Sequence, residues 1–334
     1  MRRFVFRALL ILIVIVLVAA AVGPLLIDPV PADGATDART VAEPDSRFLD
    51  LPADDGLELS IHYLERPVAG ANEDEDAPSF VLLHGFTFNA FTWNRLLDAF
   101  AEHGPTVAYD QLPYGLSSKL PAGIGGDLYS KAEAVDRLFG IMDALGMDRA
   151  ILVGNSSGGT LALDAALARP ERVEALILIS PWIEVKRPVF PAWLAGLPQM
   201  KRLSLLLARY LGGETSPLLA LSYADPRLID DERRRLMGIH RQMANWDVAW
   251  AALLDRSLTD PVRVSERLAE VEQPVLLIAG AEDRVVPVED TGDSAKSLPQ
   301  ADLTVLPDCG HVPQEECPEL VEQVIGTWLD QKGF

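Results

Sequence analysis

The chain has 334 residues, of which 49% are hydrophobic, and a formal net charge of −20. That length suffices for one large domain with an insertion or for two modest domains. A strongly acidic chain argues against nucleic acid as a partner, because phosphate binding needs clustered Lys and Arg. The charge also disfavours broad adsorption to anionic lipid, and we interpret it as a solvated surface that keeps the protein soluble.

The N-terminus has the composition of a membrane-spanning helix. Residues 8–27 carry no charge, and the run from Ala8 to Val22 is apolar without a break. Twenty helical residues span about 30 Å, the thickness of a bilayer's hydrocarbon core. Basic residues precede the run and acidic residues follow it, which predicts that the remainder of the chain lies outside the cytoplasm. These flanking residues are Arg2, Arg3 and Arg7, then Asp28, Asp33 and Asp37.

Two interpretations of residues 1–27 are open. A cleaved signal peptide would use Ala19 and Ala21 as an A-x-A-like site. The length of the apolar run favours an uncleaved membrane anchor, and both interpretations export the protein. Residues 28–46 contain Pro, Ala and Asp without an apolar period, as expected of a linker.

From about Arg47, short apolar runs alternate with helical patterns, which predicts a mostly parallel sheet flanked by helices. Between Trp182 and about Asp255 the pattern becomes helical throughout, and the alternation then resumes. We therefore predict a core formed by residues 47–181 and 256–334, with a helical cap at 182–255. Such a cap would lie over the carboxyl edge of the sheet, where ligands bind in α/β folds. The predicted strands are Leu57–Leu64, Phe80–Leu83, Thr106–Tyr109, Ala150–Val153, Val173–Ile179, Pro274–Ala279 and Leu303–Leu306, and the predicted core helices are Ser130–Leu145, Ser157–Ala168 and Glu316–Leu329.

The segment Gly154-Asn155-Ser156-Ser157-Gly158 fits the pattern G-x-S-x-G. An apolar strand leads directly into it and a helix leads directly out, which is the context of a nucleophile elbow. The simpler interpretation is a glycine-rich turn in which a serine caps the helix. The central position of the pattern makes Ser156 the candidate nucleophile. The backbone N–H of Ser157 would then point at a developing oxyanion from the start of the helix.

A second oxyanion donor is expected at the end of the strand Phe80–Leu83. The chain there reads His84-Gly85-Phe86, and the backbone N–H of Phe86 is the candidate donor. We interpret His84 itself as a structural residue that packs behind the loop.

A serine at neutral pH needs a base, and the base needs an acid to orient it. His311 follows the last predicted strand and is the candidate base, while Asp283 follows the strand before it and is the candidate acid. Glu282 is adjacent and is expected to face away. Asp110 closes another strand and is interpreted as structural. The remaining histidines are expected to be surface or packing residues, namely His62, His103 and His240.

These motifs together resemble the α/β-hydrolase superfamily with a helical cap, from about Phe48 to the C-terminus. The shared segments are HGF at His84, D-x-x-x-x-G-x-S from Asp110 to Ser117, GNSSGG at Gly154, GAEDRVVP at Gly280 and GH at Gly310. The order Ser, Asp, His along the chain is that of the family. The resemblance implies the fold but says little about the substrate.

The elbow also resembles that of carbon–carbon bond hydrolases that act on ring-cleavage products. Those enzymes carry an asparagine at the position of Asn155. Those enzymes usually carry a Trp directly after the histidine, where this chain has Val312. Haloalkane dehalogenases and epoxide hydrolases use an aspartate at the elbow, so Ser156 argues against both. Cofactor-free haloperoxidases and proline iminopeptidases share the triad and stay open.

The predicted function is therefore a membrane-tethered, esterase-like hydrolase that takes a small acyl substrate and needs no metal or cofactor. Carbon–carbon hydrolysis, haloperoxidase chemistry, acyl transfer and a non-catalytic binding role are the alternatives. The tryptophans of the cap are expected to pack its helices, or else to line an acyl pocket or a membrane-facing surface; they are Trp182, Trp193, Trp246 and Trp250. Cys309 is expected to be a small buried residue, and its pairing with Cys317 and the oligomeric state are left open.

Overall fold

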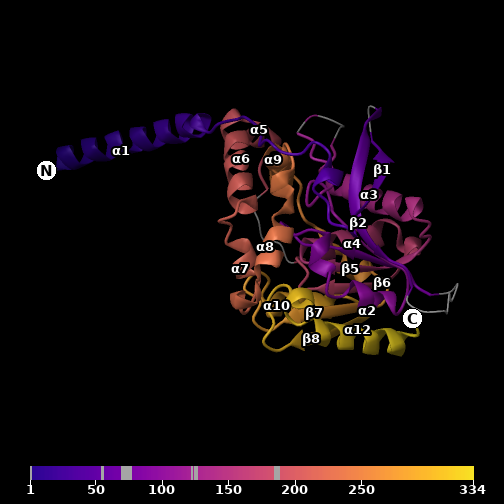
Figure 1. Ribbon diagram of the computed structural model, residues 1–334. Helices are drawn as coiled ribbons and strands as arrows, with labels where there is room; N and C mark the ends of the chain where they lie inside the picture. Colours follow the sequence, from indigo (N-terminus) through magenta and orange to yellow (C-terminus); the bar gives the residue numbers. More distant parts are fainter. Residues whose placement is uncertain (1, 54–55, 69–76, 122, 124–126, 184–188) are drawn as a thin grey trace.

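A computed structural model describes residues 2–53, 56–68, 77–121, 123, 127–183 and 189–334 (Figure 1). Most of the surface loop expected between Arg66 and Ser79 lies outside these residues. The fold is an eight-stranded sheet with helices on both faces, a further group of helices beside it, and one N-terminal helix that projects from the molecule (Figure 1).

The order of the strands across the sheet is β1-β2-β4-β3-β5-β6-β7-β8. Strand β2 is antiparallel to both of its neighbours, and all later pairs are parallel. This order confirms the mostly parallel α/β architecture, and β5 lies near its centre. The strands are β1 (Arg47–Pro52), β2 (Glu58–Arg66), β3 (Phe80–Leu83), β4 (Thr106–Tyr109), β5 (Ala150–Asn155), β6 (Val173–Ile179), β7 (Val275–Gly280) and β8 (Ala301–Leu306).

Every strand that an apolar run predicts is present within one or two residues at each end. The exception is β1, whose side chains are exposed or only half-buried. An edge strand of this kind has no apolar run to predict it, because neither of its faces is fully covered.

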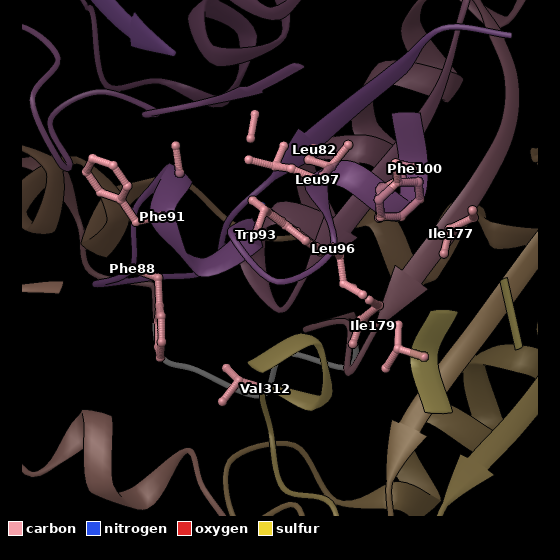
Figure 2. Packing of buried hydrophobic residues seen from close by; sticks show 14 of the residues in the cluster. Leu82, Phe88, Phe91, Trp93, Leu96, Leu97, Phe100, Ile177, Ile179 and Val312 are labelled. Atoms are coloured by element: carbon pink, nitrogen blue, oxygen red, sulfur yellow. The ribbon is translucent and has the colours of Figure 1, made fainter. Parts of the chain in front are cut away.

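The core lies on both faces of the sheet, and alternate residues of one strand belong to opposite sides. In β6, Ile177 and Ile179 pack with Trp93 and Phe100 on one face, whereas Leu176 and Leu178 pack on the other. Figure 2 shows the first of these clusters. Burial on both faces explains why the central strands read as continuous apolar runs.

The three predicted core helices are present as α3, α4 and α12, whereas α2, α10 and α11 were not predicted. Ser130 caps α3 by accepting a hydrogen bond from the N–H of Glu133 at 3.2 Å, which explains why this helix begins where the sequence indicates. The core helices are α2 (Leu97–Ala101), α3 (Lys131–Ala144), α4 (Ser157–Ala168), α10 (Val288–Ser297), α11 (Pro313–Glu316) and α12 (Pro318–Lys332).

The block between β6 and β7 is helical in its described part. Helix α9 continues to Thr259, so the helical block extends past the boundary expected at residue 255. Its helices are α5 (Ala192–Ala195), α6 (Pro198–Gly212), α7 (Leu218–Leu221), α8 (Asp231–Met237) and α9 (Trp246–Thr259). We call this group of helices the cap.

The segment expected to be a linker is bound to the cap. The N–H of Ala35 donates to the carbonyl of Gln242 at 2.7 Å, and the N–H of Ala244 donates back to Ala35 at 2.9 Å. The side chain of Asp247 accepts from the N–H of Ala32 at 2.9 Å. The polar composition of this segment suggested a free linker, but the segment is held to the cap. Most of the bonds that hold it use backbone groups, which every residue type carries, so the composition could not reveal them.

Helix α1 (Arg2–Val22) and the 3-10 turn η1 (Gly23–Leu26) form the N-terminal projection. Residues Val5–Leu26 have a mean hydropathy of 3.1 and are almost entirely unburied. By its length and apolar composition, this helix could cross a membrane. A signal sequence meets the same test.

The two-sided core makes Ile177 a sensitive position, because its side chain is fully buried. We expect Ile177→Ala to lower the free energy of unfolding by about 2–5 kcal/mol through lost burial and the cavity left behind. Leu303→Ala on β8 is the control, because Leu303 is 40% exposed and its loss should change stability by less than about 1 kcal/mol. Guanidinium denaturation in detergent, followed by tryptophan fluorescence, measures both, and equal effects would contradict this account of the core.

Candidate active site

Ser156 lies in the turn between β5 and α4, and its backbone has φ 53° and ψ −119°. A non-glycine residue at positive φ is strained and persists only where the surroundings impose it. The surroundings here are specific: the N–H of Ser156 donates to the carbonyl of Ile179, and its own carbonyl accepts from the N–H of Trp182, both at 3.0 Å. The turn therefore has the backbone geometry of a nucleophile elbow.

The glycines of this turn are required by close backbone approach. A Cβ at Gly158 would stand 2.1 Å from the carbonyl oxygen of Leu83, and one at Gly154 would stand 2.5 Å from the carbonyl oxygen of Gly158. Neither obstacle is a flexible side chain, so a larger residue would force the strand and the helix apart.

The two N–H groups expected to form an oxyanion hole border the elbow. Gly85 brings the loop after β3 so close that a Cβ there would lie 3.0 Å from the Cβ of Ser156. Within the described residues, neither the N–H of Phe86 nor that of Ser157 donates a hydrogen bond to another group of the protein. Donors without an internal partner at a cleft are available to a ligand.

Asp283 and His311 are in direct contact. Nδ1 of His311 lies 2.8 Å from Oδ2 of Asp283, and both side chains are almost fully buried. The other oxygen, Oδ1, accepts from the N–H groups of Val285 and Val286 at 2.8 and 2.9 Å. These bonds hold the carboxylate toward the imidazole, while the neighbouring Glu282 is exposed as expected.

The elbow and the histidine loop are joined by Asn155. Its Nδ2 donates to the carbonyl of His311 at 3.0 Å and to that of Ile179 at 3.1 Å. Ser156 and His311 have no direct hydrogen bond among the contacts of the described residues. Catalytic hydrogen bonds are often long before a substrate binds and shorten in the complex, so this geometry is compatible with a serine–histidine pair.

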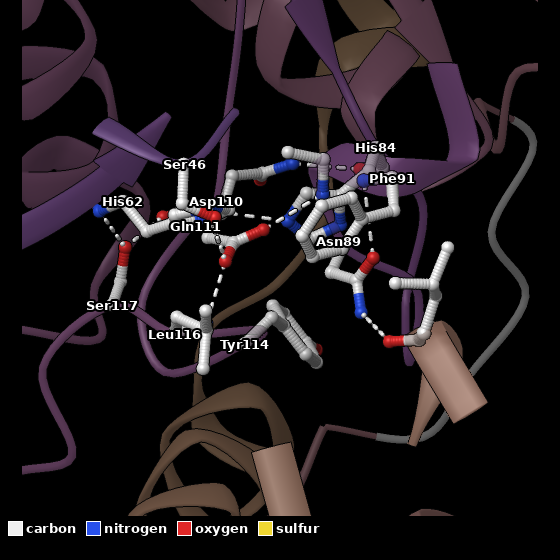
Figure 3. Close-up of polar contacts among 12 residues, drawn as sticks. Ser46, His62, His84, Asn89, Phe91, Asp110, Gln111, Tyr114, Leu116 and Ser117 are labelled. Atoms are coloured by element: carbon white, nitrogen blue, oxygen red, sulfur yellow. Dashed lines mark hydrogen bonds and ion pairs between the residues drawn. The ribbon is translucent and has the colours of Figure 1, made fainter. Parts of the chain in front are cut away.

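A second buried Asp–His pair lies behind the site, between Asp110 and His62 (Figure 3). The two side chains are fully buried, with Nδ1 of His62 2.7 Å from Oδ2 of Asp110. The carboxylate also accepts from the N–H groups of Ala90 at 2.7 Å and Leu116 at 2.6 Å. Burial alone would raise the pKa of Asp110, but His62 and these donors outweigh it and lower the pKa below its ordinary value. Asp110 thus organises its loop, as the sequence indicates.

Gly115 shows why the D-x-x-x-x-G motif needs its glycine. Its φ is +48°, and a Cβ there would lie 1.8 Å from Oδ2 of Asp110. The loop wraps tightly around the carboxylate, which accounts for the motif without any catalytic role.

The other histidines have structural contacts. Nδ1 of His84 donates to the carbonyl of Gly85 at 2.8 Å, and Nε2 accepts from the N–H of Gln111 at 3.0 Å. Burial lowers the pKa of His84, and burial next to Lys119 lowers the pKa of His240 to about 3. His62, however, is fully buried and hydrogen-bonded to Asp110 rather than in an ordinary packing position. A short strand pattern cannot reveal a partner that lies 48 residues away.

Two structural features around His311 could not be predicted from the sequence. Cys309 and Cys317 form a disulfide that spans the histidine loop. The buried carboxylate of Glu315 receives hydrogen bonds from Thr92, Tyr223 and Arg233. These donors lie far apart in the chain, so only the fold brings them together.

A mostly apolar cavity of about 280 Å³ adjoins Phe86 and Ser157. Its walls come from the core and from the cap, including Tyr109, Leu161, Trp182 and Leu253. The cap tryptophans divide between the expected roles: Trp246 and Trp250 are buried and Trp182 lines the cavity, whereas Trp193 is 71% exposed. Trp250 also contacts Tyr114, with 5.1 Å between ring centroids, which joins the cap to the site.

Comparison with known proteins places this chain among hydrolases. The family model described as the alpha/beta hydrolase fold matches residues 78–318. A 2-hydroxy-6-oxononadienedioate/2-hydroxy-6-oxononatrienedioate hydrolase from Burkholderia vietnamiensis is 30% identical over 301 residues, covering 85% of this chain and 95% of the relative.

Solved structures show the same fold. An esterase from Thermogutta terrifontis has 23% identity and a TM-score of 0.65, covering 85% of this chain and 98% of its own. A membrane phospholipase A, titled a bacterial virulence factor, has 24% identity and a TM-score of 0.65, covering 99% of both chains. That second likeness includes the N-terminal helix.

The contacts of Asp110 imply a stability role that is separate from chemistry. We expect Asp110→Asn to lower the free energy of unfolding by about 3–5 kcal/mol, because it leaves a buried network without its charge. Glu282→Gln, on an exposed carboxylate, should leave stability within about 0.5 kcal/mol. Denaturant midpoints of the purified variants measure the difference, and an unchanged midpoint for Asp110→Asn would show that the pair is dispensable.

Proposed function

Because the chain belongs to the α/β hydrolase-fold family, we propose that it is a membrane-tethered serine hydrolase that cleaves an ester-like bond of a small apolar substrate. The observation that carries the proposal is the contact of His311 with Asp283 at 2.8 Å, on a loop that Asn155 joins to the elbow of Ser156. The cavity beside Ser157 supplies a largely apolar volume for an acyl group.

In the proposed reaction, Oγ of Ser156 attacks the acyl carbonyl and its proton passes to Nε2 of His311. Asp283 keeps the imidazole oriented and stabilises its charged form. The N–H groups of Phe86 and Ser157 bind the tetrahedral oxyanion, each worth about 3–4 kcal/mol of transition-state stabilisation in such sites. His311 then returns the proton to the leaving group, and water attacks the acyl-enzyme in the same way.

Carbon–carbon bond hydrolysis is the second candidate. It is supported by the 30% identical relative, which is named for such a dioate substrate, and by the position of Asn155 beside His311. The residue type at position 312 argues against carbon–carbon bond hydrolysis. Those hydrolases usually carry a Trp at this place, whereas this chain has Val312, which is fully buried in the apolar cluster that also contains Phe88 (Figure 2).

We expect Ser156→Ala to lower turnover of acyl esters by about 10⁴-fold or more while the protein stays folded. Ser157→Ala is the matched control, because it removes a neighbouring hydroxyl and keeps the backbone N–H that the oxyanion needs. Hydrolysis of p-nitrophenyl esters and labelling with a fluorophosphonate measure the outcome. Full activity in Ser156→Ala would remove the proposal, and a wild-type protein that resists labelling would favour a non-catalytic binding role.

The two candidate chemistries predict opposite substrate preferences. If the cavity holds an acyl chain, kcat/KM for p-nitrophenyl esters should rise with acyl length until the cavity is filled. The rise should be roughly threefold to fourfold per buried methylene, from about 0.8 kcal/mol each. A ring-cleavage dienoate should then be turned over poorly. A higher kcat/KM on the dienoate than on every ester would reverse the order of the two candidates.

The proposed membrane anchor can be tested separately from the catalytic activity. Helix α1 should leave the full-length protein in the membrane fraction after alkaline carbonate extraction, because about twenty apolar residues insert almost irreversibly. Release of the protein into the soluble fraction, or a mature chain that begins after Ala21, would show a cleaved or peripheral segment instead.

A further inference from the structure

Exposed apolar side chains gather along one stripe of α6. Leu203, Leu206, Leu207 and Tyr210 are 42–52% exposed. Their spacing of i, i+3, i+4 and i+7 places them on a single face of the helix. The opposite face is buried in the cap and includes Leu205 and Ala208. Single exposed leucines are ordinary, but a contiguous apolar stripe marks a surface that contacts something apolar.

Trp193 adds an exposed apolar side chain on a helix that contacts α6. It lies on α5 and is the most exposed tryptophan of the described residues, at 71%. Tryptophan is enriched where apolar material meets water at a membrane surface. We call Trp193 and the four α6 residues the apolar stripe.

The charge of α6 is opposite to that of the whole chain. Helix α6 (Pro198–Gly212) contains Lys201, Arg202 and Arg209 and no Asp or Glu, although the chain carries a net charge of −20. Acidic lipid repels a protein whose net charge is negative. A helix that carries only basic charges reduces this electrostatic repulsion at its own surface.

The N-terminal projection is attached at this helix. Nε2 of Gln199, in the first turn of α6, donates to the carbonyl of Ala21 at 3.1 Å. The guanidinium of Arg209 donates to the carbonyls of Asp28 and Val30 at 2.8 and 2.7 Å. Figure 1 shows α1 leaving the molecule beside α6, with the axis of α6 running across the direction of α1. If α1 spans a bilayer along its own axis, α6 lies parallel to the bilayer surface at the edge of the molecule nearest to it.

We propose that the apolar stripe docks into the surface of a lipid bilayer that contains acidic phospholipids, a proposal that rests on the proposed membrane tether. The stripe supplies the apolar contact, and Lys201 and Arg202 meet the lipid head groups. Docking holds the cap, whose α9 lines the cavity, against the bilayer. An apolar substrate dissolved in the membrane then has a short path to Ser156.

The test uses the full-length protein reconstituted into vesicles of phosphatidylcholine with phosphatidylglycerol, with brominated acyl chains as a fluorescence quencher. All six tryptophans follow residue 92, so an inserted α1 contributes no signal. We expect the lipid to quench part of the tryptophan emission and Trp193→Phe to remove most of that quenched part.

Leu206→Glu should at least halve the quenching, because it places a charge in the middle of the stripe. Leu320→Glu is the matched control: Leu320 is 40% exposed on α12, in the part of the molecule away from α1 (Figure 1), and quenching should stay unchanged. Lys201→Glu combined with Arg202→Glu should weaken the quenching in acidic vesicles and leave it nearly unchanged in pure phosphatidylcholine.

Carbonate extraction of the same samples separates the two proposals. A protein that resists extraction but shows no quenching of Trp193 is anchored without docking, which overturns this inference and leaves the tether standing. Quenching of Trp193 in a protein that carbonate releases supports docking and overturns the tether. If Trp193 is instead shielded from acrylamide in detergent, and Leu206→Glu converts a dimer into a monomer, the occupant of the stripe is a second copy of the chain and the inference fails.

Discussion

The structure around the site depends on one backbone constraint, the positive φ of Ser156 at the end of β5. That conformation is costly for a residue with a side chain. It is held by hydrogen bonds from the turn to Ile179 and Trp182 and by glycines that let α4 lie directly against β3. The fully buried central strands supply the rigidity behind these contacts. The fold thereby places Ser156, which is only 7% exposed, beside two backbone N–H groups that donate to no other group among the described residues.

The two Asp–His pairs show how the same residue types acquire different roles from their surroundings. Asp110 and His62 are sealed in the protein, and the carboxylate is saturated by donors from its own loop (Figure 3). Asp283 and His311 are also buried, but they follow β7 and β8 at the carboxyl edge of the sheet, and Asn155 joins the histidine loop to the elbow. Ligands bind at this edge in α/β folds, and this location distinguishes Asp283 and His311 as the proposed catalytic pair.

The N-terminal segment, the linker and the cap behave as one connected unit in this fold. Backbone hydrogen bonds tie residues 32–35 to the cap, and Arg209 ties α6 to the chain just after η1. A tether that is bound along its length limits the orientations of the domain, whereas a free linker would permit many. The same contacts fix the exposed stripe of α6 relative to the projecting α1.

The sequence by itself determined the sheet, because strands buried on both faces must be continuous apolar runs, and it determined the elbow, because only glycines tolerate such close backbone approach. It also made Ser156, Asp283 and His311 the candidate catalytic residues, because each of them follows a predicted strand. Only the tertiary structure decided the edge strand β1, the docking of residues 28–46, the Cys309–Cys317 disulfide and the partners of His62 and Glu315. Each of these depends on groups that are distant in the chain or on backbone bonds that leave no trace in composition, so local patterns cannot encode them.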